Sequence, residues 1–334
     1  MAEGARLESV FTVTRNVGSN PTLSAIQILR VSMDIVSLVY NRENDVKNLL
    51  DSIQIQSEMP KNVWLIDNGS NRPLTIDSSK YSFPVHVVRI ENNIGIAGYN
   101  LGFKKSQAKY VMAVDSDVTL DRNAIKVFKK AIQDYPDLVV GGARILDATT
   151  QTTMFDNPIH AEPELPGGGQ QMVQFNGCCF LVLREAFLGL GGFDQRLFIY
   201  VNEWDFTLRV FNRFRMDQIR YYSEAVAYHK TAPSSDRAKL YDALIRRNEF
   251  WVRWKYYPLG SALNYSARFY VGSIKRMILG GPKDFKLFGG YLLSGTQGLT
   301  WALRERQELP SAVFEQLMKM RDTCEQPENL VRNI

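Results

Sequence analysis

The chain contains 334 residues, of which 45% are hydrophobic, so it can bury a large core and is not expected to be disordered. Its 40 Lys and Arg residues against 35 Asp and Glu residues give a net charge of only +5, and the basic residues are dispersed, which argues against a nucleic-acid partner. Its three cysteines form neither a disulfide framework nor a paired zinc-binding pattern, which favours a reducing compartment.

The N-terminal segment, residues 1–30, does not follow the pattern of the rest of the chain, and we predict an arm or an added edge element there. Its start, MAEGARLESVFTV, has no basic region followed by a long apolar core, so it does not resemble a secretory signal. No stretch of the chain reaches the roughly 18 uncharged apolar residues of a membrane span. We therefore expect a cytoplasmic protein.

From Asp34 onward, short apolar runs alternate with amphipathic segments. This pattern is typical of an α/β fold in which helices flank a mostly parallel sheet. In the segment 43–53, the apolar residues recur at helical spacing and acidic residues stand in the first turn, as a helix start prefers. The strands predicted in this half are 34–42, 62–67, 86–90, 110–115 and 137–146, and the helices are 43–53 and 121–135.

The second half of the chain begins with a Pro- and Gly-rich loop at 157–171, which is long enough to suggest a functional segment. Predicted strands at 174–183 and 221–229 follow, on either side of a helix at 203–214, and the pattern is all helical from Asp236. The predicted organisation is therefore an α/β domain at 31–235, with halves 31–120 and 121–235, and a helical extension at 236–334.

The helical extension contains an amphipathic stretch at 268–281 that has two interpretations. Its apolar side chains recur at helical spacing beside basic ones, which is typical of a helix that lies on an anionic membrane surface. The alternative is a helix packed on the α/β domain with its charges solvated. The apolar residues are Tyr270, Ile274, Met277 and Ile278, and the basic residues are Arg268, Lys275 and Arg276.

Two carboxylates stand at the exit of the predicted strand 110–115. Asp115 and Asp117 are two residues apart, with Ser116 between them. Ligands of an open α/β sheet bind at the carboxyl ends of its strands, and two such carboxylates suit Mg²⁺ or Mn²⁺ together with phosphate oxygens. An Asx-turn that caps the following segment is the alternative interpretation of the same three residues.

Other strand ends are also rich in polar residues and glycine. The first predicted strand ends in YNR (40–42), the second in DNGS (67–70), and the third in ENNIGIAGYNLG (91–102). Each of these is an ordinary turn signal by itself. Together they place hydrogen-bonding side chains and closely approachable backbone along one sheet edge, which indicates a nucleotide cleft.

Seven motifs, taken in order, resemble the series found in family-2 inverting glycosyltransferases with the GT-A fold. They are most similar to the rhamnosyltransferase-like branch of bacterial cell-surface polysaccharide synthesis, and they extend over about residues 33–257. The motifs are VSLVYNR, WLIDNGSN, ENNIGIAGYNLG, YVMAVDSDV, FNGCCFLVLREAF, GGFDQRLFIYVNEWDFTLR and AVAYHK. The resemblance implies transfer of a sugar from a nucleoside-diphosphate donor to a glycan or lipid-linked glycan acceptor, with the donor bound in the half 31–120.

The resemblance also implies roles for individual residues. Asp67 would bind the base of the donor, and the second aspartate, Asp117, would hold Mn²⁺ or Mg²⁺. Asp115 would contact the ribose region and is also a candidate metal ligand, and His229 would complete the metal or diphosphate site. The remaining donor-binding candidates are Tyr40, Asn41, Arg42, Asn93, Gly95, Asn100 and Ser116.

The catalytic base is the point at which the chain departs from the family. Inversion requires a carboxylate that removes the proton of the acceptor hydroxyl. The family usually supplies it from a Glu-Asp pair at a helix start, and here the pair is Asn202-Glu203. We predict that Asn202 caps the helix and that Glu203 is the base, kept ionised by the helix dipole. Asp205 is the second candidate.

Competing functions fit less well. A sugar nucleotidyltransferase needs a glycine-rich phosphate loop after the first strand, and a nicotinamide dehydrogenase needs G-x-G-x-x-G there. The remaining alternative is a catalytically degenerate transferase that binds a nucleotide sugar or a partner. The residues do not distinguish a thymidine diphosphate rhamnose donor from a uridine diphosphate sugar.

Overall fold

The computed structural model describes residues 32–154, 164–230 and 235–324, all of which belong to one compact unit, 31–334. The arm or edge element expected at 1–30 lies outside the described residues, as does much of the loop expected at 157–171. The division into an α/β domain and a helical extension at residue 235 stays a prediction.

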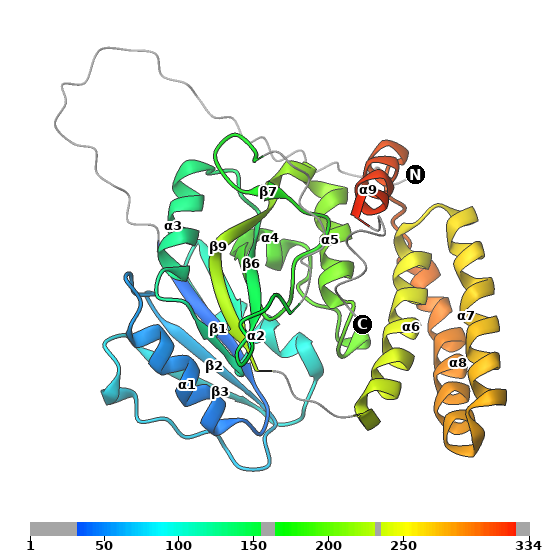
Figure 1. The fold of residues 1–334 in the computed structure, drawn as a ribbon, viewed down its shortest axis with the longest axis horizontal. Helices are drawn as coiled ribbons and strands as arrows, with labels where there is room; N and C mark the ends of the chain where they lie inside the picture. Colours follow the sequence, from blue (N-terminus) through cyan, green and yellow to red (C-terminus); the bar gives the residue numbers. More distant parts are fainter. Residues whose placement is uncertain (1–31, 155–163, 231–234, 325–334) are drawn as a thin grey trace, which may run out of the picture. The chain divides into compact units, whose positions relative to one another are not determined.

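Among the described residues, nine strands form one mixed sheet (Figure 1). The strand order is β3-β2-β1-β4-β8-β6-β9-β5, and β7 pairs with β9 outside this path. The strands are β1 (Met33–Val39), β2 (Val63–Asn68), β3 (Val85–Ile90), β4 (Tyr110–Val114), β5 (Val118–Leu120), β6 (Val140–Asp147), β7 (Gln170–Gln171), β8 (Cys179–Leu183) and β9 (Ile219–His229).

The sheet is parallel in its first half and mixed in its second. Strands β3, β2, β1 and β4 are parallel to one another, as the alternating pattern predicts. Strand β8 is antiparallel to both β4 and β6, and β5 and β7 are antiparallel to β9. Apolar runs indicate that a strand is buried but not which way it runs, so the mixed half was not predicted.

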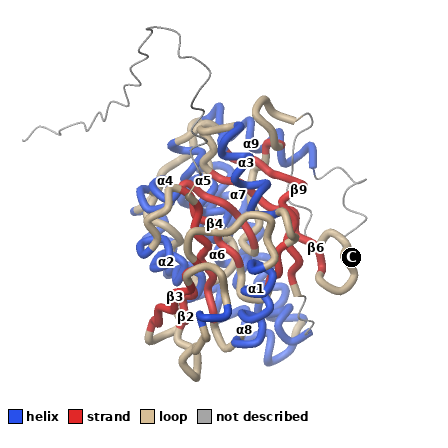
Figure 2. The backbone as a smooth tube through the Cα atoms, turned by 90° about the vertical axis from the view of Figure 1, so that its left-hand side faces the viewer, coloured by secondary structure: helices blue, strands red, loops and turns tan. Residues whose placement is uncertain are grey.

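Helices cover both faces of the sheet (Figure 2). Because strand side chains alternate between faces, Ile35 packs in the core under Leu49 and Phe128, whereas its neighbour Val36 packs in the opposite core with Phe103. The first face carries α1 (Glu43–Gln54) and α3 (Ala124–Asp134), and the second carries α2 (Tyr99–Lys105), α4 (Arg184–Gly189) and α5 (Asn202–Arg213).

The helical C-terminal region expected from residue 236 is confirmed (Figure 1). It contains α6 (Ser235–Tyr256), α7 (Leu259–Leu279), α8 (Gly281–Arg304) and α9 (Ser311–Cys324). Trp251 on α6 is buried, and its indole donates a hydrogen bond to the carbonyl of Gly295 on α8 (2.8 Å). None of the helices in the described ranges combines the length and the apolarity that a bilayer span requires.

A buried ion network joins α5 to α6. The carboxylate of Asp205 is 0% exposed and contacts Arg209 (2.6 Å), Lys255 (3.0 Å) and the hydroxyl of Tyr256 (3.0 Å). Burial raises the pKa of Asp205, but the Arg209 and Lys255 cations outweigh burial and hold the pKa below its ordinary value. The network therefore fixes the helical region against the sheet domain.

We predict that Asp205→Asn lowers the free energy of unfolding by about 3 kcal/mol, because it leaves Arg209 and Lys255 buried with too little counter-charge. Lys255 keeps a second acid, Asp194, at 3.6 Å, which places the effect at the low end of the usual range. Urea unfolding at pH 7 measures the loss. The pKa of Asp205 is lower in the folded than in the unfolded chain, so the ionised carboxylate stabilises the fold at pH values above 3.8. This stabilisation is lost as the pH falls below 3.8, and the difference between the variant and wild type should therefore shrink there.

The matched control is Lys130→Ala, which breaks an ion pair with Asp134 on the surface of α3. The Lys130 side chain is 70% exposed, so this change should alter stability by less than about 1 kcal/mol. Equal losses in the two variants would contradict the structural role of the network.

Candidate functional site

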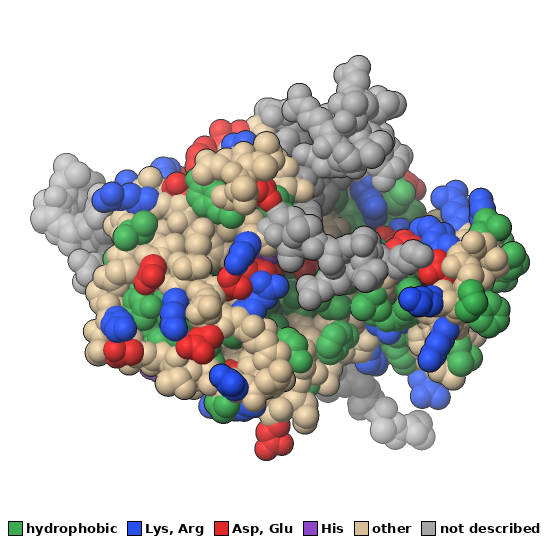
Figure 3. Space-filling model, turned by 60° about the horizontal axis from the view of Figure 1, so that its bottom comes forward, with side chains coloured by type: hydrophobic (Ala, Val, Ile, Leu, Met, Phe, Trp, Pro, Cys, Tyr) green, Lys and Arg blue, Asp and Glu red, His purple; other side chains and the backbone are tan. Residues whose placement is uncertain are grey.

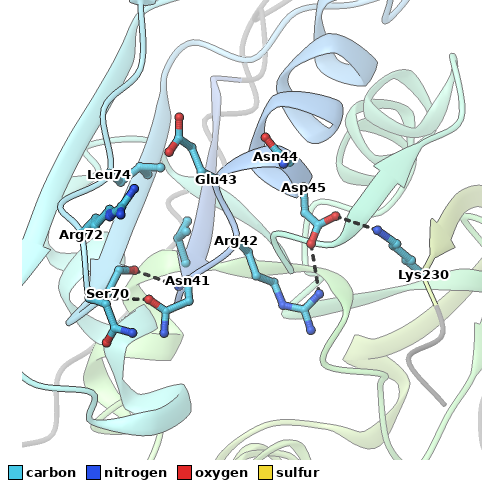
Figure 4. A pocket seen from close by; sticks show the side chains of 11 residues that line it. Asn41, Arg42, Glu43, Asn44, Asp45, Ser70, Arg72, Leu74 and Lys230 are labelled. Carbon is cyan, nitrogen blue, oxygen red and sulfur yellow. Dashed lines mark hydrogen bonds and ion pairs between the residues drawn. The ribbon is translucent and has the colours of Figure 1, made fainter. Parts of the chain in front are cut away.

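A pocket of about 590 Å³ lies at the carboxyl ends of β1 and β2, beside the start of α1 (Figure 4). Three cations line it, Arg42, Arg72 and Lys230. Figure 4 shows Arg42 and Lys230 converging on Asp45, at 3.1 and 3.2 Å. The other lining residues are Val39, Asn41, Glu43, Asn44, Ser70, Asn71 and Leu74. We call this space the cationic pocket; its charge and its backbone amides suit an anionic, hydrogen-bonding ligand.

Asp67 holds the 70–74 loop, which forms one wall of the cationic pocket, although Asp67 itself does not line the pocket. It is buried, and its carboxylate accepts hydrogen bonds from the backbone of Ser70 (3.0 Å) and Leu74 (3.1 Å) and from Arg89 (2.5 Å). Burial raises its pKa, but these hydrogen bonds outweigh burial and the pKa lies below its ordinary value. Asp67 is thus an ionised residue that shapes the 70–74 loop, and its role toward a nucleobase stays a prediction. Sequence reasoning missed Arg89.

The predicted residues at the end of β1 have different positions. Asn41 has a φ of 55° and ties the two loops together, because it accepts from the amide of Asn71 (2.8 Å) and its own amide donates to Ser70 Oγ (3.0 Å). Arg42 lines the pocket, whereas the Tyr40 side chain is 44% exposed and is not among the lining residues.

The two aspartates of the DSD motif lie beside His229, as the resemblance implies. Strand β5 pairs with β9 so that Val118 is opposite His229, which puts His229 Nε2 3.5 Å from Asp117 Oδ1. The other oxygen of Asp117 contacts Arg42 (3.0 Å), which also lines the cationic pocket. Arg42 therefore connects the two aspartates and His229 to this pocket. Asp115 accepts a hydrogen bond from the Tyr99 hydroxyl (2.8 Å), and Ser116 is buried.

Asp115, Asp117 and Glu203, which we call the acid cluster, influence one another electrostatically. Burial, and then the charge of Asp117, raises the pKa of Asp115 to about 6, with a smaller contribution from Glu203. Burial also raises the pKa of Glu203. This desolvation opposes the effect predicted for the helix start, which is to favour the ionised form. A base whose pKa is raised toward neutral pH is better matched to proton removal.

Side chains beside Asp117 could hold a divalent cation. Ligand atoms of Asp115, His229 and Cys178 all lie within 4.8 Å of one another. Burial, followed by the charges of Asp115 and Glu203, raises the pKa of the Cys178 thiol well above its ordinary value. The carboxylates of Asp115 and Asp117 and the imidazole of His229 are ligand types that suit Mn²⁺ or Mg²⁺.

Gly177 makes room for Glu203. A Cβ atom at residue 177 would lie 1.9 Å from Glu203 Oε1, so only glycine allows the carboxylate to occupy this position. The adjacent carbonyl of Cys178 accepts the amide hydrogen of Asp115 (2.8 Å), which brings the same loop to the acid cluster. Sequence reasoning missed Gly177, although it lies within the quoted FNGCC motif.

The turn before Glu203 has a strained backbone. Phe198, Tyr200 and Val201 have φ angles of 60°, 66° and 66°, in a region that non-glycine residues rarely adopt. Helix α5 begins at Asn202 with Val201 in the capping position and no side-chain cap, so the prediction that Asn202 is the cap is wrong. The αL conformation of Val201 turns the chain directly into the helix instead. Asp205, the second candidate base, belongs to the buried network with α6.

Asn248 on α6 holds this turn in place. It is 0% exposed, and its side-chain amide donates to the carbonyls of Leu197, Ile199 and Tyr200, each at 2.9 Å. Gly95 supports the turn from the other side, since the amide of Ile96 donates to the Phe198 carbonyl (2.7 Å). The resulting close approach leaves no space for a side chain at residue 95.

The remaining predicted donor-binding residues make internal contacts. Asn93 accepts from Asn68 (3.0 Å) and from the amide of Gly95 (2.9 Å). The Asn100 side chain donates to the Phe193 carbonyl (2.9 Å) and accepts from its amide (2.8 Å). These residues do not line the cationic pocket; Asn93 ties its segment to the end of β2, and Asn100 ties it to Phe193.

Comparisons with known proteins relate part of the chain to a sequence family and its fold to solved structures. Residues 34–189 match the sequence model of the family Glycosyl transferase family 2, so this part of the chain is a family-2 glycosyltransferase domain. An uncharacterized glycosyltransferase of Haemophilus influenzae is 26% identical over 191 residues, 53% of this chain and 61% of that protein. The uncharacterized glycosyltransferase YwdF of Bacillus subtilis is 26% identical over 35% of this chain and 43% of that protein. The chain thus spans less than two thirds of either relative.

Solved structures extend the likeness beyond this domain. Residues 1–349 of S. aureus TarS have a TM-score of 0.55 at 16% identity, covering 84% of this chain and 82% of that one. GalNAc-T7 in complex with UDP, GalNAc and Mn²⁺ has a TM-score of 0.51 at 13% identity, covering 67% and 50%. At these identities the likeness is one of fold, and the GT-A fold with a helical C-terminal region is confirmed.

We predict that Asn248→Ala lowers the free energy of unfolding by about 1–3 kcal/mol, because the carbonyls of the strained turn lose their shared donor. Asn248→Asp, which keeps the volume but removes the donor, should cost at least as much. Asn264→Ala, at an exposed position on α7, should stay within about 0.5 kcal/mol of wild type. Thermal unfolding measures all three. A tolerated Asn248→Asp would contradict the role of the donor.

Proposed function

We propose that the chain transfers a sugar from a nucleoside-diphosphate donor to a hydroxyl of a glycan or lipid-linked glycan, by direct displacement with inversion. The observation that carries this proposal is the acid cluster at the sheet edge, in which the Asp115–Asp117 pair and Glu203 stand together beside His229. One set of residues can hold a cation while the separate carboxylate removes a proton. The family-2 domain at 34–189 supports the same reaction class.

The donor is proposed to occupy the cationic pocket and to extend past Arg42 toward the acid cluster. The polar groups of the 70–74 loop and of Asn41 suit a base and a ribose, whereas Arg42 and Lys230 suit phosphate oxygens. Arg42 contacts Asp45 and Asp117 and could exchange these partners for a diphosphate. The structure of TarS 1–349 in complex with UDP-GlcNAc, at a TM-score of 0.54, supports a nucleotide-sugar ligand for this fold.

The cation would be held by Asp117, Asp115 and His229. When bound, Mn²⁺ or Mg²⁺ neutralises the charge that develops on the departing diphosphate. Asp117 Oδ1 faces His229 and could bind the cation, while Oδ2 contacts Arg42, whose guanidinium could also pair with the diphosphate. Tyr99 orients Asp115 through its hydroxyl hydrogen bond.

Glu203 is the proposed base. Its carboxylate takes the proton of the acceptor hydroxyl as that oxygen bonds to the anomeric carbon, and the bond from this carbon to the diphosphate breaks with the electron pair leaving on the nucleotide. The site beside Gly177 fixes where the carboxylate stands, and burial raises its pKa toward that of an effective base. The structural role of Asp205 leaves Glu203 as the single candidate.

The donor is proposed to be thymidine diphosphate rhamnose or a uridine diphosphate sugar. The first is proposed because the motif series resembles the rhamnosyltransferase-like branch.

The proposed reaction is tested directly by measuring nucleoside-diphosphate release from a panel of activated sugars with Mn²⁺ and an acceptor. Donor binding without release from any sugar would instead favour a catalytically degenerate binding subunit, which the Asn202-Glu203 departure keeps open.

We predict that Glu203→Gln abolishes transfer while it leaves the donor affinity within a few-fold of wild type by calorimetry, because the change removes only the proton acceptor. Glu224→Gln, at an exposed position on β9, is the matched control and should retain full turnover. Gly177→Ala should lower kcat with little change in donor KM, since its methyl group displaces the Glu203 carboxylate. Near-normal turnover of Glu203→Gln would remove this residue from the mechanism.

We predict that donor affinity depends on the divalent cation and on Asp117. A chelator should weaken nucleotide-sugar binding at least about tenfold, and added Mn²⁺ should restore it, because the diphosphate then regains its counter-charge. In Asp117→Asn the added Mn²⁺ should no longer restore binding. Donor affinity that is unchanged by the chelator would exclude the metal-assisted form of the proposal.

A further inference from the structure

Helices α7 and α8 form a hairpin whose tip exposes large apolar side chains. The two helices lie side by side and are joined at Gly280 (Figure 1). At the tip, Ile278 and Leu279 are 73% and 72% exposed, and Phe285 on the first turns of α8 is 59% exposed. These are large side chains to leave in water at one place, and together they make an exposed apolar patch. We call Ile278, Leu279 and Phe285 the hairpin tip.

Packing of the hairpin is satisfied by other residues. Phe269 on α7 stacks on Phe250 of α6 with a centroid distance of 4.5 Å, and Phe288 on α8 is also buried. A Cβ atom at Gly295 of α8 would lie only 2.9 Å from the Phe269 ring, so these faces are in direct contact. The hairpin tip lies away from these contacts. Its apolar side chains are therefore not needed to pack the helices against one another.

The surroundings of the hairpin tip are positively charged. Between residues 259 and 304 there are six Lys and Arg residues and one acid, Asp284, whose side chain is buried. Lys275, Lys283 and Lys286 are exposed next to the tip and form no ion pair with any residue in the described ranges. Arg276, also near the tip, forms an ion pair with Asp242 on α6 (3.0 Å). Figure 3 shows apolar and basic side chains together over this hairpin.

We propose that the hairpin tip docks on an anionic lipid bilayer surface. Apolar side chains that enter the boundary between headgroups and acyl chains, with lysines around them that contact anionic headgroups, are the combination that holds a peripheral protein on a membrane. A protein partner would have to match three exposed lysines with acids, whereas an anionic bilayer supplies such charges at any position. Within the 268–281 stretch, Phe269 and Tyr270 pack against Phe250 of α6, and the membrane interpretation is proposed only for its exposed end. This inference does not depend on the proposed reaction.

The test is co-sedimentation of the full chain with phosphatidylcholine vesicles that contain or lack phosphatidylglycerol. We expect binding to the anionic vesicles, weaker at high salt, and little binding to the neutral ones. Ile278→Asp/Leu279→Asp and, separately, Lys283→Glu/Lys286→Glu should each reduce the bound fraction about tenfold. Ile55→Asp, at a 62% exposed position after α1, is the matched control and should bind as wild type.

Two outcomes would overturn the proposal. One is vesicle binding that neither double variant reduces. The other is absence of vesicle binding together with a self-association in gel filtration that Ile278→Asp/Leu279→Asp abolishes, which would make the hairpin tip an interface between copies. Because the substituted side chains are exposed, both variants should keep the wild-type melting temperature. The lysine pair remains a test if the aspartate pair does not fold.

Discussion

The position of Glu203 depends on a turn that the chain would not adopt by itself. Three non-glycine residues in close succession, Phe198, Tyr200 and Val201 with only Ile199 between the first two, have left-handed backbone angles that cost about 1–3 kcal/mol each. The two N–H groups of the Asn248 amide, shared among three carbonyls, offset part of this cost, at about 1 kcal/mol for each N–H. The helical C-terminal region therefore contributes to the site through α6, although none of the acid cluster lies on it.

The acid cluster is a second constraint, because its members oppose one another. Asp115 and Glu203 have raised pKa values, and the charge of Asp117 contributes to the first of these. Arg42 offsets the charge of Asp117 through their ion pair. In the proposed function a divalent cation would offset more of it, so donor binding and charge neutralisation would be coupled through Arg42, which contacts both Asp45 in the cationic pocket and Asp117.

The sequence predicted the parts of this arrangement that depend on local pattern. Apolar runs indicated the strands, and the polar residues after them indicated Asp115, Asp117 and Arg42, because strand ends of one sheet edge meet in space. His229 was indicated only by the family resemblance. Asn248, Gly177 and Arg89 could not be predicted in the same way, since each acts on a segment far away along the chain. The Asn202 cap was wrong for the same reason: local preference favours a side-chain cap, but contacts from α6 and from residue 95 impose another conformation on Val201.

The substitution of the usual Glu-Asp pair by Asn202-Glu203 is consistent with the charge of the site. Asn202 is fully buried, and a carboxylate there would add a further negative charge close to Glu203 in a site that already contains Asp115 and Asp117. A neutral amide avoids this repulsion. The proposed base keeps the second position of the pair but has a longer side chain, and the missing side chain of Gly177 provides the space that the extra methylene requires. The two changes together are compatible with the proposal that a single glutamate serves as the base.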